Sequence, residues 1–352
     1  MNVLMVGVDK KRLGGMWTVA DNYISNQKFN EQVDLDYVAT STNGSIIKRL
    51  IFMIKGIRKI KRMLKKKTYD IVHIHMAEKG STFRKGYVAK ICKKRGYKVV
   101  IQLHAGPFTD WYDTLNNYKQ NKVKRIFDYA DKVLVLGEFW KNELAKIVSS
   151  QKIEVLYNGI KIPEKNFYNS QNRTLVFMGV LKKEKGIYDL IDALKLIDDK
   201  IPEDIKILFC GNDPYKKIDN IISEQGLNNR IKLLGWIDSK EKEKIYKNTK
   251  INILPSYFEA LSMTVLEAMS YGVPVITTNI STMEEMLGNS EQLVPVGEPQ
   301  ILAKKILEFI NNDSKLELIS QQEYKKAKEV FSMENNINET LRIYKETIGS
   351  DN

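Results

Sequence analysis

The sequence predicts an α/β protein of two domains, each built on a parallel β-sheet with helices on both faces. The length of 352 residues exceeds that of an ordinary single domain and favours two. Short apolar runs alternate with helical patterns along the whole chain. These runs are nearly continuous rather than alternating in polarity, which is typical of strands buried on both faces. Two such domains imply a cleft between them.

Ten short apolar runs are expected to form the strands. In the first half of the chain they are residues 2–8, 33–39, 71–75, 99–104 and 132–136. In the second half they are residues 174–180, 205–210, 230–234, 251–255 and 273–277. Helical patterns separate these runs, as parallel strands require.

The domain boundary is expected where this pattern breaks. A turn at residues 158–163 is followed by the polar stretch 164–173. We therefore assign residues 1–165 to an N-terminal domain and residues 166–330 to a C-terminal domain. Residues 331–352 are expected to form a last helix that packs back on the N-terminal domain.

The net charge is +13, and basic residues are concentrated in one segment of the chain. Between Lys48 and Lys67 there are ten basic residues and no acidic one. Apolar residues recur there at helical spacing: Leu50, Met53, Ile54, Ile57, Ile60 and Leu64. We expect an amphipathic helix with a basic outer face, which is either simply solvated or attracted to an anionic membrane or polyanionic substrate. Nucleic acid is not expected as a partner, because no recognition motif for it is present.

Other classes of protein are disfavoured by composition. No apolar run approaches the roughly 20 residues that span a bilayer. The first residues have no basic region typical of a signal peptide. Cys92 and Cys210 lie far apart, so neither a disulfide framework nor a zinc ribbon is expected, and both should be buried. We expect a cytoplasmic protein, held peripherally at the inner face of the plasma membrane if the basic helix binds lipid.

All three histidines fall where ligands of open α/β sheets bind, beyond the carboxyl ends of strands. His73 and His75 end the run DIVHIH, and His104 ends KVVIQLH. A histidine in a strand is often a satisfied core residue. Three at one edge point instead to a site in the first half of the chain.

Two glycine-containing loops each follow a strand and precede a helix. The first ends at Gly14 and Gly15 and lacks the G-x-G-x-x-G spacing of a dinucleotide site. A glycine pair there either binds an anion at the helix start or simply forms a turn. The second loop, GVLKKEKG, brings together Lys182, Lys183 and Lys185, whose mutual repulsion an anionic phosphate would relieve.

The stretch FEALSMTVLE carries Glu259 where a strand ends and Glu267 along the helix that follows. Ala260 and Ser262 are small and leave the first N–H groups of that helix open to a ligand. Acids on both sides of a phosphate site suit a nucleotide sugar. The alternative is a helix-entry acid at Glu259 and a solvated glutamate at Glu267.

The segment FEALSMTVLEAMSYGVPVI resembles the E-x7-E motif of the retaining glycosyltransferases of family 4. Further motifs extend the resemblance over nearly the whole chain: YDIVHIH, LHAGPF, LYNGI, the Lys-Gly loop and LVPVGEPQILAKKILEFI. It implies the GT-B fold, with two Rossmann-like domains whose parallel sheets face a central cleft. It also implies sugar transfer from a nucleoside-diphosphate sugar, such as a UDP-sugar, to a lipid-linked or oligosaccharide acceptor. The first half is most similar to bacterial enzymes of capsular, exo- or lipopolysaccharide synthesis.

The resemblance implies roles residue by residue. Glu259 matches the acid that contacts the transferred sugar, and Glu267 matches the acid that holds the ribose hydroxyls. Lys185 matches the lysine that neutralises the donor diphosphate. His104 matches a histidine near the sugar and acceptor, and Gly15 belongs to the loop over the phosphates.

The start of the helix between the two glutamates matches the family's diphosphate-binding segment. Its donor-binding residues are Ala260, Leu261, Ser262, Met263 and Thr264. Val180 stands where the family commonly has an arginine. Either Lys182 or Lys183 supplies the missing charge, which we favour, or diphosphate binding is weaker. Residues 280–285, ISTMEE, replace the usual Gly-Gly-x-x-Glu of the donor pocket.

Acceptor binding is expected at Gly14, His75 and the aromatic residues Phe108, Trp111 and Tyr112. Aromatic rings suit sugar faces or a lipid carrier, although this segment could instead be a packed lid.

No metal cofactor is expected, because Lys185 and the helix start can stabilise the charge that grows on the diphosphate. Asp34 and Asp36 form a D-x-D pattern, but strand alternation puts both on one strand face. Two other functions stay open: a nucleotide-sugar epimerase of the same architecture and a non-catalytic carbohydrate-binding relic. The sequence leaves the sugar, the linkage and the base undetermined.

Overall fold

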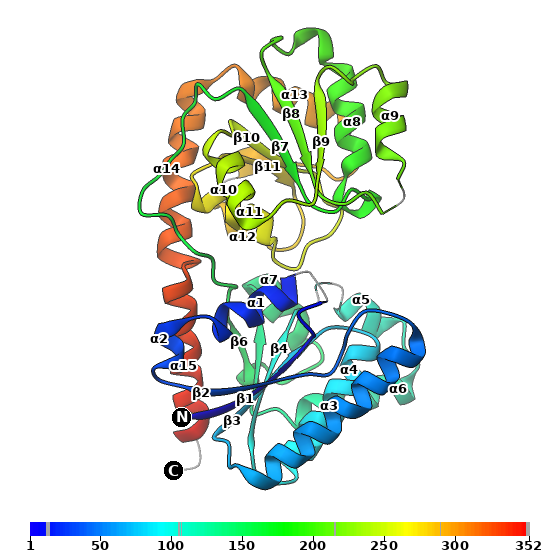
Figure 1. Ribbon diagram of the computed structural model, residues 1–352, viewed down its shortest axis with the longest axis vertical. Helices are drawn as coiled ribbons and strands as arrows, with labels where there is room; N and C mark the ends of the chain where they lie inside the picture. The colour runs from blue at the N-terminus through cyan, green and yellow to red at the C-terminus, as the bar shows by residue number, and fades with distance from the viewer. Residues whose placement is uncertain (12–14, 105, 107, 215, 289, 350–352) are drawn as a thin grey trace. The chain divides into compact units, whose positions relative to one another are not determined.

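The computed structural model describes residues 1–11, 15–104, 106, 108–214, 216–288 and 290–349. The chain forms two compact units (Figure 1). Unit 1 comprises Met1–Gly159 and Met333–Asn352, and unit 2 comprises Ile160–Ser332. The chain therefore passes between the units twice. The boundary inferred from the sequence at residue 165 lies a few residues beyond the first crossing.

Unit 1 is built on a six-stranded sheet whose strand pairs are all parallel. The strands are β1 (Asn2–Gly7), β2 (Asp34–Ala39), β3 (Ile71–Met76), β4 (Lys98–Leu103), β5 (Lys132–Val135) and β6 (Ile153–Val155). Their order is β2-β1-β3-β4-β5-β6. The direction of strand addition reverses between β1 and β3. Loops diverge at such a reversal, where open α/β sheets bind ligands.

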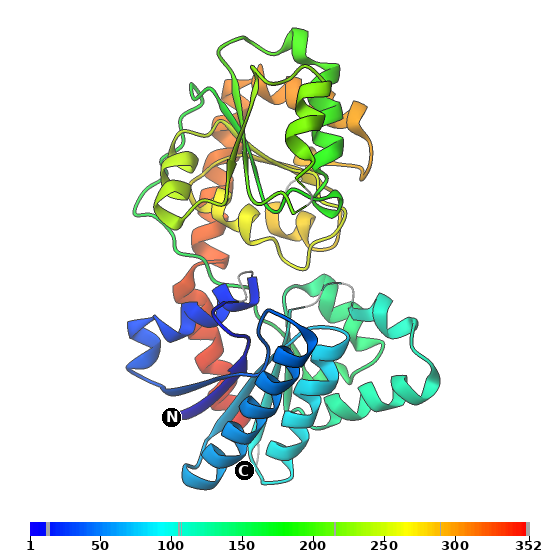
Figure 2. The same ribbon diagram turned by 45° about the vertical axis from the view of Figure 1, so that its right-hand side comes forward.

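Helices cover both faces of this sheet. One face carries α1 (Gly15–Ile24), α2 (Gln27–Asn30) and α15 (Met333–Gly349). The other face carries α3 (Ile46–Lys66), α4 (Gly80–Lys93) and α6 (Asn117–Asp128), and α3 lies beside α4 (Figures 1 and 2). Shorter elements complete the unit: α5 (Phe108–Asp113), α7 (Glu138–Ala145) and the 3₁₀ turn η1 (Ser150–Lys152).

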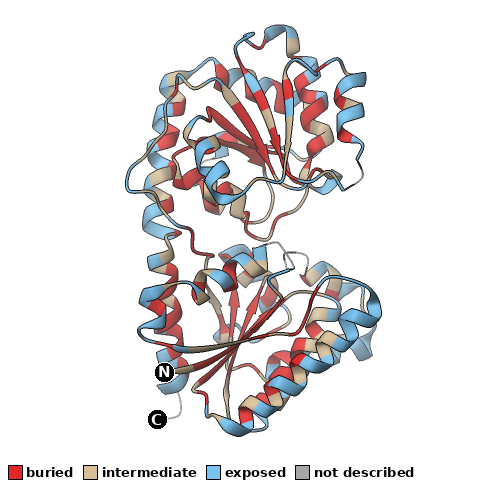
Figure 3. Cartoon of the chain, in the orientation of Figure 1, coloured by how far each residue is buried: buried red, intermediate tan, exposed pale blue. Residues whose placement is uncertain are grey.

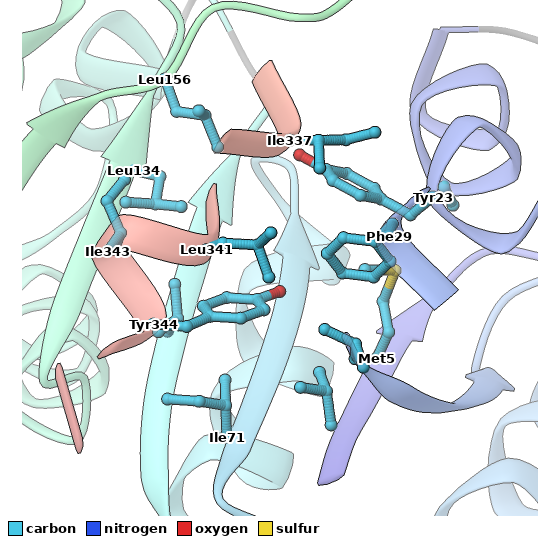
Figure 4. Packing of buried hydrophobic residues seen from close by; sticks show 14 of the residues in the cluster. Met5, Tyr23, Phe29, Ile71, Leu134, Leu156, Ile337, Leu341, Ile343 and Tyr344 are labelled. Atoms are coloured by element: carbon cyan, nitrogen blue, oxygen red, sulfur yellow. The ribbon is translucent and has the colours of Figure 1, made fainter. Parts of the chain in front are cut away.

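The last helix of the chain is part of the unit 1 core (Figure 4). Ile337, Leu341 and Tyr344 of α15 pack with Tyr23 and Phe29 against the sheet. These five side chains are almost completely buried, and each such side chain contributes roughly 1.5–3 kcal/mol to hydrophobic stabilisation. Residues separated by three hundred positions in the sequence are thus joined in one core.

Unit 2 has a second six-stranded parallel sheet, in the order β12-β11-β10-β7-β8-β9. The strands are β7 (Thr174–Met178), β8 (Lys206–Cys210), β9 (Ile231–Gly235), β10 (Ile251–Leu254), β11 (Val275–Thr278) and β12 (Leu293–Val294). The helices are α8 (Ile187–Leu196), α9 (Ile218–Glu224), α10 (Ser239–Lys247), α11 (Met263–Ser270), α12 (Met283–Leu287), α13 (Pro299–Ile310) and α14 (Asp313–Val330). The 3₁₀ turns are η2 (Lys183–Lys185), η3 (Asp198–Lys200) and η4 (Ser290–Gln292). Strand addition reverses here between β7 and β10.

The predicted fold class is confirmed, and all ten predicted strands are present within a few residues of their expected bounds. Two strands, β6 and β12, were not predicted. Both lie at a sheet edge and are only three and two residues long, too short to produce a recognisable apolar run.

The amphipathic pattern of α3 is only partly as predicted. Ile60 and Leu64 are buried, but Leu50 and Ile54 are 52% and 39% exposed. The buried residues of α3 lie in its later turns, whereas its first turns are exposed on their outer side (Figure 3). Its outer surface therefore begins with a cluster of exposed apolar side chains: Ile46, Ile47, Leu50, Ile51 and Ile54. We call these five residues the apolar patch of α3.

Within the described ranges, no helix is both long enough and apolar enough to cross a bilayer. Cys92 and Cys210 are buried and unpaired, as predicted. Burial raises the pKa of each thiol to about 12.

A buried carboxyl group in unit 2 is expected to make stability depend on pH. Glu323 of α14 is 1% exposed, and its Oε1 accepts a hydrogen bond from Gln292 Nε2 at 2.5 Å. Burial raises its pKa from 4.5 to about 8. Folding therefore takes up a proton between these values, and this group's contribution to stability is lost as the pH rises through that window.

Glu323→Gln is expected to remove this dependence, because glutamine resembles the protonated acid. Relative to the wild type, the variant should gain up to about 1.4 kcal/mol in unfolding free energy per pH unit between pH 5 and 8. Urea unfolding at several pH values measures this, with Glu203→Gln at an exposed position as the control. Parallel pH profiles for Glu323→Gln and the wild type would contradict the assignment.

Candidate functional site

The loops that follow β7 and β10 meet in unit 2, because these two strands are neighbours at the reversal of the sheet. Gly186, in the loop after β7, has φ +71°, and a Cβ there would lie 1.9 Å from the Pro255 carbonyl oxygen. The Tyr257 N–H donates to the Glu184 carbonyl at 3.0 Å. Glycine is therefore required where the Lys-Gly loop rests on the loop after β10.

This arrangement brings Lys185 to Glu259. Lys185 Nζ lies 2.5 Å from Glu259 Oε1, which also accepts a hydrogen bond from Ser256 Oγ at 2.9 Å. Glu259 is only 7% exposed, whereas the Lys185 side chain is 25% exposed. A nearly buried carboxylate thus orients a cation that remains accessible to a ligand.

The start of α11 lies directly after Glu259. Ser262 is its N-cap, but no side chain caps the helix there. The Ser262 hydroxyl instead lies 3.1 Å from Thr264 Oγ1. Thr282, in the segment ISTMEE, donates to the Ala260 carbonyl at 3.1 Å and so anchors the preceding loop. The uncapped N–H groups and the helix dipole favour an anion at this position.

One face of α11 is packed in the core of unit 2. Leu261 precedes the helix, and with Val265, Ala268 and Met269 it is buried. Met263, Thr264 and Glu267 are less buried. Glu259 and Glu267 therefore flank a helix start whose apolar side is fixed in the core.

Glu267 has a partner that sequence reasoning missed. Lys242 Nζ of α10 lies 2.8 and 2.7 Å from the two carboxylate oxygens of Glu267. Burial raises the pKa of Glu267, and the attraction of Lys242 opposes that rise. Tyr246 of α10 donates to the Thr264 carbonyl at 3.1 Å, which holds α10 against α11. No local pattern could reveal this pair, because it arises only from helix packing.

The other two lysines of the loop are less constrained. Lys182 Nζ lies 3.8 Å from Glu184, and Lys183 is exposed. Val180 is 39% exposed. Compensation of the missing arginine by Lys182 or Lys183 stays a prediction.

The three histidines of unit 1 form a connected cluster. His75 Nδ1 and His104 Nε2 are 2.7 Å apart, and the His73 and His75 rings stack with centroids 4.6 Å apart. His73 Nδ1 lies 2.6 Å from the Tyr344 hydroxyl of α15. Burial lowers the pKa of His73 and His104 to about 3, and that of His75 well below its usual value. All three are therefore neutral at physiological pH.

His75 and His104 differ in accessibility. His75 is completely buried, so the structure places it behind His104 rather than at a surface where an acceptor binds. His104 is partly exposed at the end of β4. Lys85, another residue not predicted, is fully buried below the same edge and donates to the Val6 and Gly7 carbonyls at 2.9 Å.

The aromatic segment after His104 is mostly packed. Phe108 and Tyr112 are 2% and 6% exposed. The Phe108 ring lies against Phe127 and Trp111, with centroids 5.5 and 5.3 Å apart. As placed, Phe108 and Tyr112 are inaccessible to a sugar, which agrees with the alternative of a packed segment. Trp111 is partly exposed.

Of the two glycines in the first loop, Gly15 is among the residues that the structure describes. Gly14 lies outside the described residues. Gly15 begins α1 and lines a cavity of about 420 Å³ in unit 1.

The D-x-D pattern lies on one strand face, as predicted. Lys67 Nζ contacts Asp34 and Asp36 at 2.8 and 3.0 Å, and Tyr69 donates to Asp36. Among the residues that the structure describes, no group of three or more His, Cys, Asp or Glu side chains is arranged to hold a metal ion.

Two parallel six-stranded sheets, each in its own α/β unit, have the architecture of the GT-B fold of glycosyltransferases. Two family models together match most of the chain: "Glycosyltransferase Family 4" matches residues 25–162, and "Glycosyl transferases group 1" matches residues 160–326. The chain therefore belongs to this family of glycosyltransferases.

Several known proteins are similar over long stretches. The uncharacterized glycosyltransferase MJ1178 of Methanocaldococcus jannaschii is 27% identical, over 98% of each chain. The capsular polysaccharide biosynthesis glycosyltransferase CapH of Staphylococcus aureus is 27% identical over 68% of this chain and 67% of its own. Anabaena HepE, solved with UDP and glucose, superposes with a TM-score of 0.74 at 17% identity, covering 98% of this chain and 100% of HepE.

Proposed function

We propose that this chain is a retaining glycosyltransferase that uses a nucleoside-diphosphate sugar, without a metal ion, to extend a bacterial surface polysaccharide. The observation that carries the proposal is the contact of Lys185 with Glu259 beside the uncapped start of α11. The name of CapH supports a role in capsule synthesis, and the UDP in the HepE structure supports a uridine nucleotide.

The proposed mechanism follows from where charge develops. As the bond between the anomeric carbon and the diphosphate oxygen breaks, negative charge grows on the diphosphate. The Lys185 ammonium and the N–H groups at the start of α11 are oriented in advance, so they stabilise the transition state more than the ground state. The acceptor oxygen bonds to the anomeric carbon, and its proton passes to the departing phosphate oxygen.

The remaining site residues have supporting roles in this proposal. Glu267 accepts hydrogen bonds from the ribose hydroxyls in exchange for its contact with Lys242. Glu259 orients Lys185 and contacts the sugar. Neutral His104 can donate or accept a hydrogen bond to the sugar or the acceptor without introducing a charge.

Thermal unfolding with UDP, GDP and ADP, each with and without EDTA, tests the proposal. Binding to the folded state should raise the melting temperature by mass action, for one nucleotide more than for the others, and EDTA should leave the shift unchanged. If EDTA abolished the shift in melting temperature and magnesium restored it, the hypothesis of metal-independent donor binding would be contradicted. No shift with any nucleotide would contradict the donor site.

We also propose that α3 holds the enzyme at an anionic membrane, which suits a lipid-linked acceptor. The apolar patch occupies the first turns of α3, and basic side chains dominate its later outer surface. Exposed apolar side chains beside cations are typical of helices that lie in the membrane interface. Each cation near an anionic surface contributes about 1 kcal/mol.

Co-sedimentation with phosphatidylglycerol vesicles tests this role of α3. Replacing Lys59, Arg62 and Lys66 by glutamine should weaken binding by more than tenfold, since three such charges are lost. Replacing Lys119, Lys124 and Arg125 on α6 removes the same charge elsewhere in unit 1 and should have a much smaller effect. Equal losses in both variants would indicate attraction by net charge alone.

A further inference from the structure

The cavity of about 420 Å³ in unit 1 lies at the reversal of its sheet. Its walls come from the segments that follow β1 and β3, together with the first turns of α1, α3 and α4. Cavities that bind small molecules commonly measure about 300–1,000 Å³ and occur at such reversals. Position and size therefore both favour a ligand site.

The lining of this cavity has an excess of positive charge. Arg49 comes from α3, Lys79 from the loop after β3, and Arg84 from α4, while Glu78 is the single carboxylate among the described residues that line the cavity. Arg49 is exposed, but it lies on the same helix face as the buried Gly56 and Ile60 and therefore on the side of α3 that borders the cavity. Three cations and one acid therefore border the same cavity.

The backbone adds to this excess. The N-terminus of α4 opens into the cavity at Gly80 and Ser81, and no side chain caps it. A Cβ on Gly80 would meet nothing within 4 Å, so the space before the helix is open. The dipole of this helix, 14 residues long, favours an anion at that end.

Trp17 supplies a different kind of contact in the same cavity. It is half-buried, and its ring is held edge to face against Tyr37, with centroids 5.9 Å apart. An indole held in this way offers a flat apolar surface to a sugar ring. The cavity thus combines a surface for a sugar with a cluster of cations for an anion.

We propose that this cavity binds the acceptor by a phosphate group, with Arg49, Arg84 and the start of α4 around the phosphate and Trp17 against the adjoining sugar. This inference rests on the proposed glycosyltransferase function. Arg49 is flanked in α3 by residues of the apolar patch, which favours a lipid-linked phosphate over a soluble sugar phosphate.

Tryptophan fluorescence of the full-length protein tests the proposal. Geranyl phosphate, glucose 6-phosphate, geraniol and glucose are titrated separately, and Trp17→Phe shows which part of the signal comes from the cavity. We expect both phosphates to change the Trp17 signal, geranyl phosphate at the lower concentration, and the neutral compounds to bind much more weakly. Arg49→Gln should weaken phosphate binding about tenfold, because one charge-assisted contact is lost. Arg58→Gln removes the same charge from the outer side of α3 and should have little effect.

The outcomes separate this inference from the proposed function. Equal phosphate affinity in Arg49→Gln and the wild type, or no signal dependent on Trp17, would overturn the acceptor site even where nucleotides stabilise the protein. Tighter binding of glucose 6-phosphate than of geranyl phosphate would support the phosphate site and overturn the lipid-linked source. Phosphate binding without any nucleotide effect would leave this site standing and count against the donor site in unit 2.

Discussion

Replacing Lys185 by alanine is expected to lower kcat/KM for sugar transfer by about 10²–10³-fold, equivalent to about 2.7–4 kcal/mol of transition-state stabilisation. The reason is that Lys185 is oriented by Glu259 before the reaction, so its charge is in position as the diphosphate leaves. Most of the loss should appear in kcat, because charge develops mainly in the transition state. Steady-state kinetics with the nucleotide sugar identified by thermal unfolding measures the effect.

Two controls make the result interpretable. Lys200→Ala removes a charge from an exposed position in unit 2 and should leave activity nearly unchanged. Unfolding measurements on Lys185→Ala are also needed, because Glu259 is nearly buried and loses its cation in that variant. Near-normal turnover in a stably folded Lys185→Ala would remove the central residue of the proposed mechanism.

Loss of the Glu267 carboxylate is expected to have an effect of similar size. Glu267→Ala should cost on the order of 2–4 kcal/mol in catalysis, by analogy with other preorganised polar groups. In our proposal Glu267 positions the nucleotide through its ribose, so the affinity for the nucleoside diphosphate should fall as well. Calorimetric titration of the nucleotide, alongside kinetics, measures both losses.

Lys242 provides a pH-dependent test of the same group. Its attraction lowers the pKa of Glu267 against the rise caused by burial. In Lys242→Met that attraction is gone, so the pKa rises further and more of the acid is protonated at low pH. Nucleotide affinity in this variant should therefore increase as the pH rises, more steeply than in the wild type. An identical pH dependence in both proteins would show that the ionised form of Glu267 is not used in binding.

The donor-side cluster could be predicted from the sequence because its determinants are local. The Lys-Gly loop and FEALSMTVLE each follow a strand, and ligands of parallel sheets bind beyond strand ends. Neighbouring strands then bring Lys185 to Glu259. The spacing of Glu259 and Glu267 along one segment also fixes their relation to the start of α11.

Contacts made between helices could not be predicted in this way. Lys242 reaches Glu267 from α10, and Lys85 is buried although lysines are mostly exposed. The exposed part of α3 was also missed, because helical periodicity identifies one face of a helix but not how far along that face the rest of the protein extends. Leu50 and Ile54 continue the apolar spacing beyond the region where it is buried.

The arrangement of the three histidines could be predicted only in part. Their position at strand ends could be read from the sequence, but their order from the interior outward could not. Tyr344 contacts His73, His73 stacks on His75, and His75 contacts the partly exposed His104. The first member of this series lies on α15, far from the others in the sequence.

Because α15 belongs to unit 1, the order in which the two units complete their cores differs from the order in which they are translated. Residues from Ile160 to Ser332 leave the ribosome before Met333–Gly349 does, so unit 2 can close its core while unit 1 still lacks a helix. Until then Tyr23, Phe29 and His73 face a vacant position in the nascent chain. The domain that is translated first is therefore the last to be completed, and a ribosome that stops before the final helix releases a chain with only one finished core.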